Sequence, residues 1–188
     1  MRGQAMTEEV KHDFFLAKKD FLTKQQCEEF VKFLDKQDSN VDFIKTIVDE
    51  VIAWNNATLK FDINPEQPTI LNYTSYEAQV KSTATPDHAI HIGNVSHPTP
   101  AKWSVIVNLH DRDQVQGGEL VFRNWAPTPY KDNFGIWKGD PKKPHVPQWI
   151  NELGTIVIYP SMVEHGHLLV TSGTATRAKV LVLGPQFV

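Results

Sequence analysis

The chain has 188 residues, of which 40% are hydrophobic and 10% aromatic, and this is enough apolar surface for one folded domain with a substantial core. Nineteen basic against 22 acidic side chains give a net charge of −3, which excludes the basic excess that binding to a nucleic-acid backbone requires. The single cysteine, Cys27, excludes an intrachain disulfide and a cysteine zinc cluster, and it favours a reducing, cytoplasmic location.

The first third of the chain is predicted to be mainly helical. After a short strand at residues 14–16, Thr23 and Gln26 have the spacing of a capping box, and the apolar residues that follow fall on one helical face. A second amphipathic helix is predicted from about residue 41 to residue 59, with its end fraying at Asn55. The apolar stripe of this second helix consists of Phe43, Ile44, Ile47, Val48, Val51 and Ile52.

From residue 69 onward, short β-rich runs replace the helical pattern. They cover residues 70–76, 89–92, 103–109, 119–122, 155–159 and 179–183, and turn residues such as Gly117, Gly118 and Gly154 separate them. Regularly spaced strands without intervening helices favour a jelly roll or barrel over a parallel α/β sheet. The predicted class is therefore mainly β with N-terminal α-helices.

Residues 123–153 interrupt this rhythm with five prolines and several large aromatic residues. A loop of this length inside a compact domain is usually functional or disordered, and its aromatic content argues against disorder. It is interpreted either as a lid or substrate wall, or as a hydrophobic flap over a sheet edge. No run of about 18 apolar residues occurs anywhere, so no membrane-spanning segment is expected.

Four pieces of the sequence, in this order, resemble the prolyl-hydroxylase-like branch of the Fe(II)/2-oxoglutarate oxygenases. They are residues 20–28, residues 117–122, residues 154–161 with His165, and Gly173 with Arg177. The resemblance implies a double-stranded β-helix of the jelly-roll or cupin-like type. It also implies one domain over residues 1–188, with helical support at about 20–60 and the β-helix core at about 69–185.

The resemblance also implies a site for Fe(II) and 2-oxoglutarate. His91 and His165 take the places of the two histidine ligands, and Arg177 takes the place of the cation that binds the distal carboxylate of 2-oxoglutarate, a task that suits a planar bidentate donor. Tyr76 matches a tyrosine that is a second hydrogen-bond donor to the cosubstrate. The interval between His165 and Arg177 is slightly longer than the family usually has.

Each of these residues also has a structural interpretation. A histidine in a β-rich core is often an ordinary hydrogen-bonded side chain, and an arginine at the start of a strand is often a surface cation. The alternative histidines are His88, His97, His110 and His167. These four are interpreted as surface residues or as neighbours of the ligands.

Gly93 departs from the family pattern, because the family has a carboxylate ligand two residues after the first histidine. One explanation is halogenation, since a glycine leaves room for chloride on an iron that has two neutral ligands. A second is a carboxylate from elsewhere, with Asp87 and Glu164 nearest in sequence but poorly placed. The third explanation is an engineered change in a hydroxylase. The fourth is a binding module with an inactive site.

The predicted function is Fe(II)/2-oxoglutarate-dependent oxidation of an unactivated C–H bond, with dioxygen and a small-molecule or amino-acid-like substrate as partners. Gly93 suggests halogenation or a halide-accepting iron, which would add chloride to the cofactors. The alternatives are a hydroxylase with an unusual metal site and a non-catalytic β-barrel module. That module would bind a peptide or carbohydrate through Trp125, Trp137 and Trp149. Neither a nucleic acid nor a membrane is expected as a partner.

Overall fold

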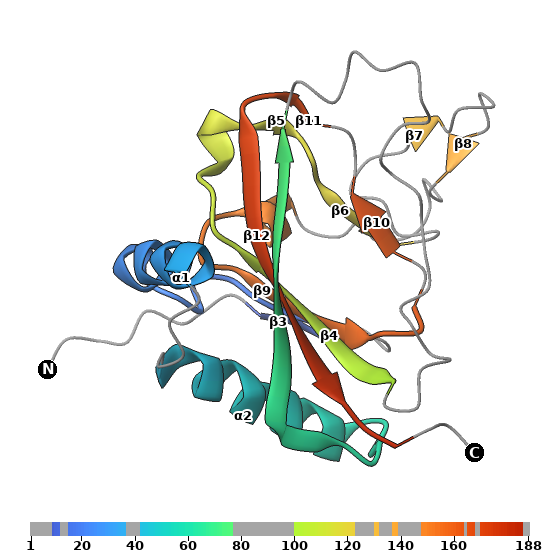
Figure 1. Ribbon diagram of the computed structural model, residues 1–188. Helices are drawn as coiled ribbons and strands as arrows, with labels where there is room; N and C mark the ends of the chain where they lie inside the picture. The colour runs from blue at the N-terminus through green and yellow to red at the C-terminus, as the bar shows by residue number, and fades with distance from the viewer. Residues whose placement is uncertain are drawn as a thin grey trace, which may run out of the picture.

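The computed structural model describes residues 9–11, 15–36, 42–76, 100–122, 130–131, 137–138, 148–163, 165–167 and 170–185. These residues form one six-stranded sheet, three two-stranded sheets and two α-helices (Figure 1). Strand therefore predominates, and the two helices lie in the N-terminal part of the chain. Both features confirm the mainly β class with N-terminal helices.

The six-stranded sheet is antiparallel throughout, with the order β1-β2-β9-β4-β12-β3. Its strands are β1 (Glu9–Lys11), β2 (Leu16–Lys18), β3 (Asn64–Tyr76), β4 (Ala101–Asn108), β9 (Ile156–Pro160) and β12 (Thr174–Leu183). Every residue of β4 and β9 is buried. Both strands are central, so both of their faces are covered.

Alternate residues of the central strands enter two different cores, because successive side chains of a strand point to opposite faces. Val105 and Val107 belong to the core that includes the helices. Ile106 and Val157, which are paired between β4 and β9, belong to the core on the other face. We call the helix-covered side the outer face of the sheet and the opposite side the inner face.

The two helices cover the outer face, to the left and below in Figure 1. Helix α1 (Lys24–Lys36) begins with the predicted capping box, in which the Gln26 backbone N–H donates to Thr23 Oγ1 (3.2 Å) and the Thr23 N–H donates to Gln26 Oε1 (2.8 Å). Its residues Cys27 and Phe30 are buried against the sheet.

Helix α2 (Asp42–Ala57) confirms the second predicted helix, but Asn55 does not mark a frayed end. This residue is 3% exposed, and its Oδ1 accepts hydrogen bonds from Trp103 Nε1 (2.9 Å) and from the Phe61 N–H (2.8 Å). Its amide also donates to the Phe61 carbonyl (3.0 Å). Asn55 therefore fastens the helix end to β4 and to the chain that enters β3.

A second, smaller layer lies over the inner face. It contains β5 (Gln116–Gly117) paired with β11 (Val170–Ser172), and β6 (Leu120–Phe122) paired with β10 (His165–His167). Leu120 and Phe122 pack in the inner core with Tyr159 of β9. A separate hairpin consists of β7 (Tyr130–Lys131) and β8 (Trp137–Lys138). The inner core is thus enclosed between two layers of strands.

The predicted strands at 103–109, 119–122 and 155–159 correspond to β4, β6 and β9, and those at 70–76 and 179–183 are parts of the longer β3 and β12. The strand predicted at 89–92 lies outside the described residues. Two antiparallel layers agree with the predicted architecture in outline, while the double-stranded β-helix remains a prediction. In the described part of the chain, neither helix has both the length and the apolar character needed to cross a membrane.

Candidate functional site

His165 lies at the start of β10 and points between the two layers. Its side chain is 1% exposed, and its ring centroid lies 4.7 Å from that of Tyr159 on the main sheet. Its Nδ1 lies 2.7 Å from the Val163 carbonyl oxygen. A carbonyl oxygen only accepts, so Nδ1 carries the hydrogen and a neutral His165 has its lone pair on Nε2.

Nε2 of His165 lies 3.2 Å from Nζ of Lys179 on β12. In this contact the ammonium donates and the imidazole lone pair accepts. Lys179 is half-buried, and its desolvation lowers the pKa of the amine. The lone pair of His165 is thus directed into the space that the Lys179 amine enters.

Arg177 lies two residues before Lys179 and is 0% exposed. Its Nη2 donates to the Gly118 carbonyl oxygen, which joins β12 to the connection between β5 and β6. Gly118 has a φ of 77°, and a Cβ there would lie 3.2 Å from Arg177 Nη2 and 3.0 Å from Val170 Cγ2. The Gly-Gly-Glu-Leu segment is therefore needed for the close approach of this guanidinium.

The surroundings of Arg177 include two polar residues, one at the end of β4 and one just after it. Asn108 is its direct partner in the strand register and is fully buried, with its amide donating to the Ile150 carbonyl (2.7 Å). Nδ1 of His110 donates to the Thr176 carbonyl (2.9 Å). Burial and the charge of Arg177 lower the pKa of His110 to about 4, so this imidazole is neutral at pH 7.

The structure describes only part of the predicted site. His165 and Arg177 are both buried, and their roles as metal ligand and cosubstrate cation stay predictions. His91 and Gly93 lie outside the described residues. Tyr76 ends β3, where its backbone pairs with Thr174, whereas Arg177 pairs with position 73. Directly paired residues share a face of the sheet, so the register places position 73 on the face of Arg177.

Some of the remaining candidate residues are described by the structure and others are not. The described His110 and His167 are half-buried and buried, respectively, and neither is a surface side chain. His88, His97, Asp87 and Glu164 lie outside the described residues. So does Trp125, while Trp149 packs against the inner core. Of these aromatic side chains only that of Trp149 is described, so the choice between a lid and a flap stays a prediction.

Among the described residues, His165 has the chemistry of one iron ligand and Arg177 that of a carboxylate-binding cation. Metal-binding histidines commonly donate one ring N–H to a carbonyl, which fixes the other nitrogen as the ligand, and His165 has this arrangement. Among the described residues, no three His, Cys, Asp or Glu side chains gather in a way that would hold a metal ion. Further ligands would therefore have to come from other parts of the chain, such as His91.

Lys179 is the residue that the sequence analysis missed. Its signal was its position, because residues two apart on a strand share a face, and Arg177 was already assigned as the cation for the cosubstrate. The last predicted strand was bounded at residues 179–183, so its alternation was not extended back to Arg177. Once β12 is seen to start at Thr174, both side chains belong to the inner face.

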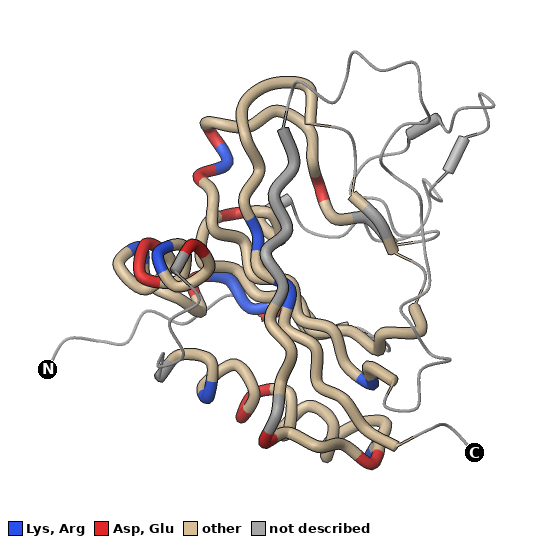
Figure 2. The backbone as a smooth tube through the Cα atoms, in the orientation of Figure 1, with Lys and Arg blue, Asp and Glu red and all other residues tan. Residues whose placement is uncertain are grey.

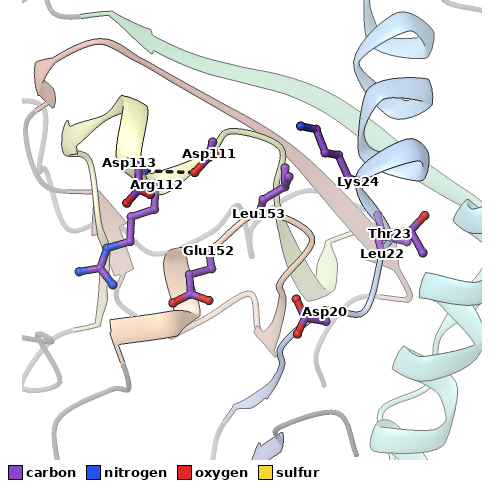
Figure 3. Close-up of a pocket in the computed structure, with 9 residues that line it drawn as sticks. All are labelled: Asp20, Leu22, Thr23, Lys24, Asp111, Arg112, Asp113, Glu152 and Leu153. Atoms are coloured by element: carbon purple, nitrogen blue, oxygen red, sulfur yellow. Dashed lines mark hydrogen bonds between the residues drawn. The ribbon is translucent and has the colours of Figure 1, made fainter. Parts of the chain in front are cut away.

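A separate pocket of about 670 Å³ lies away from this histidine, between the start of α1, the 3-10 helix Arg112–Gln114 and the turn after Asn151 (Figure 3). Its polar lining mixes Asp20, Asp111, Asp113 and Glu152 with Lys24 and Arg112. Asp111 accepts a hydrogen bond from the Asp113 N–H (3.2 Å), as the dashed line in Figure 3 shows. Neither His165, Arg177 nor Lys179 lines this pocket, so it is not the predicted site.

No protein-family model matches the chain, and no curated protein matches its sequence. Solved structures do match its fold. A prolyl-4-hydroxylase of Pseudomonas putida has a TM-score of 0.58 and 10% identity, covering 98% of this chain and 100% of that one. A prolyl 4-hydroxylase of Phytophthora capsici has a TM-score of 0.58 and 12% identity over 92% of this chain and 59% of that one.

A third structure is a viral collagen prolyl hydroxylase of Paramecium Bursaria Chlorella virus-1 in complex with 2OG. Its TM-score is 0.55 at 12% identity, covering 92% of this chain and 97% of that one. At such low identity these matches show a shared fold. The fold predicted from the sequence resemblance is therefore supported at the level of the overall arrangement.

Proposed function

We propose that the chain is an Fe(II)/2-oxoglutarate-dependent oxygenase that oxidises an unactivated C–H bond in a small-molecule or amino-acid-like substrate. The observation that carries this proposal is the orientation of His165, whose Nδ1–H donates to the Val163 carbonyl (2.7 Å). The Nε2 lone pair, which Lys179 Nζ contacts at 3.2 Å, would then be the metal ligand. The fold shared with the prolyl hydroxylases supports the same class.

Two side chains would bind the cofactors from opposite layers. His165 of β10 would bind the iron through Nε2, with His91 as the second imidazole. Arg177 of β12 would bind the distal carboxylate of 2-oxoglutarate, with its guanidinium already positioned by the Gly118 carbonyl. When bound, iron and 2-oxoglutarate supply the oxidising power that reacts dioxygen with a C–H bond, and succinate and carbon dioxide are the co-products.

The protein would hold His165 in position and exclude water from one side of it. Tyr159, Phe122 and Phe15 pack in series beside His165, with ring centroids 4.7 Å (His165–Tyr159), 5.1 Å (Tyr159–Phe122) and 5.4 Å (Phe122–Phe15) apart. This aromatic wall holds the imidazole and keeps one side of it apolar. A dry wall of this kind favours charge interactions within the site.

Anaerobic titration with Fe(II) and 2-oxoglutarate tests the proposal. The chelated pair gives a visible charge-transfer absorption band, and His165→Gln should abolish it while leaving the far-UV circular dichroism unchanged. His110→Gln tests the competing histidine. If the band survives in His165→Gln and is lost in His110→Gln, the ligand assignment is wrong. If the wild-type protein gives no band, the proposal fails, and the alternative of a non-catalytic β-barrel module is favoured.

A finer version of the proposal concerns halide. Position 93 is glycine, so the side chains expected at the iron are two neutral imidazoles, with Lys179 as a neighbouring cation. This balance of charge favours an anion such as chloride beside the metal. We propose halogenation as one outcome of the same oxidation, with hydroxylation as the alternative.

Product analysis separates these two outcomes. Chloride should shift the charge-transfer band of the wild-type protein, and Gly93→Asp should remove that shift and direct products toward hydroxylation. Mass spectrometry of reactions with a metabolite extract would detect the gain of chlorine or of oxygen. A wild-type band that ignores chloride, together with unchanged products in Gly93→Asp, would reject the halide branch and leave the oxygenase assignment intact.

A further inference from the structure

Asn108 is a fully buried amide at the end of β4, where it lies beside Arg177. The two residues are direct partners in the register of β4 and β12. The Leu109 N–H donates to the Thr176 carbonyl (3.0 Å), so Asn108 and Arg177 form the adjoining non-hydrogen-bonded pair. In such a pair the Cα atoms are about 4.5 Å apart and the side chains are close together. The amide and the guanidinium therefore leave the sheet side by side, on the same face.

Three hydrogen bonds fix Asn108 in place. Its backbone N–H donates to the Thr155 carbonyl (3.0 Å), and its backbone carbonyl accepts from the Gly154 N–H (2.9 Å). Its side-chain Nδ2 donates to the Ile150 carbonyl (2.7 Å). A carbonyl oxygen only accepts, so this bond determines which end of the amide is nitrogen and which is oxygen. The amide oxygen Oδ1 is therefore held on the side away from Ile150.

Oδ1 of Asn108 is a buried acceptor that has no hydrogen-bond partner within the described part of the chain. Such an acceptor is costly in free energy, and native proteins seldom keep one without a role for it. The side chain beside it belongs to Arg177, one of the two basic residues of β12 (Figure 2). Oδ1 is the negative end of the amide dipole, and burial strengthens its attraction for a neighbouring guanidinium. The position of this oxygen therefore favours one orientation of that group.

We infer that Asn108 is a positioning residue that orients the guanidinium of Arg177 for a carboxylate. The Gly118 carbonyl accepts from Nη2, and Oδ1 of Asn108 offers the guanidinium a second fixed acceptor. One acceptor alone lets the planar group rotate, whereas two define its plane, and a carboxylate that accepts two parallel N–H bonds must lie in that plane. The inference rests on the proposed function, in which Arg177 binds the distal carboxylate of 2-oxoglutarate.

Calorimetric titration in the presence of Mn(II) tests the inference. The ligands are 2-oxoglutarate and 2-oxopentanoate, which has the same keto-acid end but lacks the distal carboxylate, and the measured quantity is the ratio of their dissociation constants. The variants are Asn108→Leu, which has nearly the same shape without polar atoms, and Asn108→Ser, which is small enough to fit without a clash. Ser104→Ala is the matched control, because Ser104 is a buried polar residue of the same strand that bonds to Ser161 (2.7 Å). Circular dichroism and thermal melting establish that each variant is folded.

We expect both Asn108 variants to lower the preference for 2-oxoglutarate over 2-oxopentanoate by about tenfold, since they remove an acceptor from a charged group. The affinity for 2-oxopentanoate itself should not change, because this acid makes no use of Arg177. Ser104→Ala should keep the preference of the wild type. In an Arg177→Gln background the preference is already lost, so adding Asn108→Leu should change nothing further.

Two results would overturn the inference: folded Asn108 variants that keep the preference of the wild type, or variants that bind both acids more weakly by the same factor, as a purely structural role predicts. A further loss when Asn108→Leu is added to Arg177→Gln would also overturn it, because Asn108 would then act without Arg177. Failure of the proposed function reads differently, since the wild type would give no Fe(II) charge-transfer band and bind neither acid, which rejects both ideas. A normal band with an unchanged preference rejects the positioning role alone.

Discussion

At the scale of single residues, backbone carbonyls position two of the candidate site residues, His165 and Arg177. The Val163 carbonyl fixes the tautomer of His165, and the Gly118 carbonyl accepts from Arg177. Backbone acceptors move little when a side chain changes, so both groups are pre-organised for binding. Changes to the segments that carry these carbonyls should therefore affect ligand binding without removing any ligand-binding side chain.

Gly118→Ala is expected to weaken cosubstrate binding through Arg177. The new Cβ would lie 3.2 Å from Arg177 Nη2 at a φ of 77°, so the guanidinium must shift and the backbone is strained, at a cost of about 1–3 kcal/mol. Urea unfolding measures the loss of stability, and calorimetry measures the loss of affinity for 2-oxoglutarate. Thr23→Ala is the control, since loss of a helix cap costs about 1 kcal/mol and is remote from the inner face. Equal affinities in the two variants would contradict the positioning role of Gly118.

Cys27 is expected to resist thiol reagents in the folded protein. It is 1% exposed, and burial raises the pKa of its thiol to about 11, whereas only the thiolate reacts. Labelling with a chromogenic disulfide at pH 8 should be slow in buffer and fast in denaturant. Because the folded pKa is raised, the neutral thiol contributes stability below pH 9 that is lost as the pH rises toward about 11. Rapid labelling of the native protein at pH 8 would show that the thiol is accessible.

The sequence suggested site residues where a motif fixed their position, and these assignments stay predictions. It did not point to Lys179, whose contact depends on strand phase. His165 follows a recognisable lead-in at 154–161, and Arg177 follows Gly173 at the spacing of a strand start. Lys179 has no motif, and its contact with His165 Nε2 (3.2 Å) depends on how β10 lies over β12. Such a contact between separate layers cannot be read from local periodicity, because packing between the layers sets it.

At the scale of elements, local signals predicted the helices well and their ends less well. The capping box at Thr23 involves neighbours only three residues apart, so its hydrogen bonds follow directly from the sequence. Asn55 was misread as a fraying end because its partners, Phe61 and Trp103, come from outside the helix. Strands β10 and β11, of three residues each, were too short for an alternating pattern to appear.

Replacing Asn55 is expected to lower the free energy of unfolding strongly, although helix α2 lies on the outside of the fold. Asn55→Ala would leave the indole N–H of the fully buried Trp103 and the Phe61 N–H without their acceptor, and each unsatisfied buried donor costs about 1–3 kcal/mol. Chemical denaturation should show a loss of roughly 2–4 kcal/mol. Asn55→Asp, which keeps the acceptor oxygens, tests the hydrogen bonds against the loss of packing. If the alanine variant is as stable as the wild type, Asn55 is not an anchor.

At the scale of the whole molecule, the candidate site lies where the two strand layers meet. The main sheet supplies Arg177 and Lys179, the smaller layer supplies His165, and the aromatic contact between Tyr159 and His165 (4.7 Å) bridges them. The two helices lie on the outer face, away from these side chains (Figure 1). This separation explains why helix signals predicted the support of the fold without indicating its chemistry.

Because the site joins the layers, ligands that bind there should stabilise the whole fold. A ligand that binds only the folded state adds about 2.7 kcal/mol at one hundred times its Kd, so Mn(II) with 2-oxoglutarate should raise the melting temperature of the wild type. Hydrogen exchange should slow most in β10 and in the middle of β12, since these segments carry the groups that the ligands would contact. His165→Gln should lose the contribution of the metal. A melting temperature unaffected by both ligands, or exchange that slows only at the pocket of Asp20 and Asp111, would place ligand binding elsewhere in the molecule.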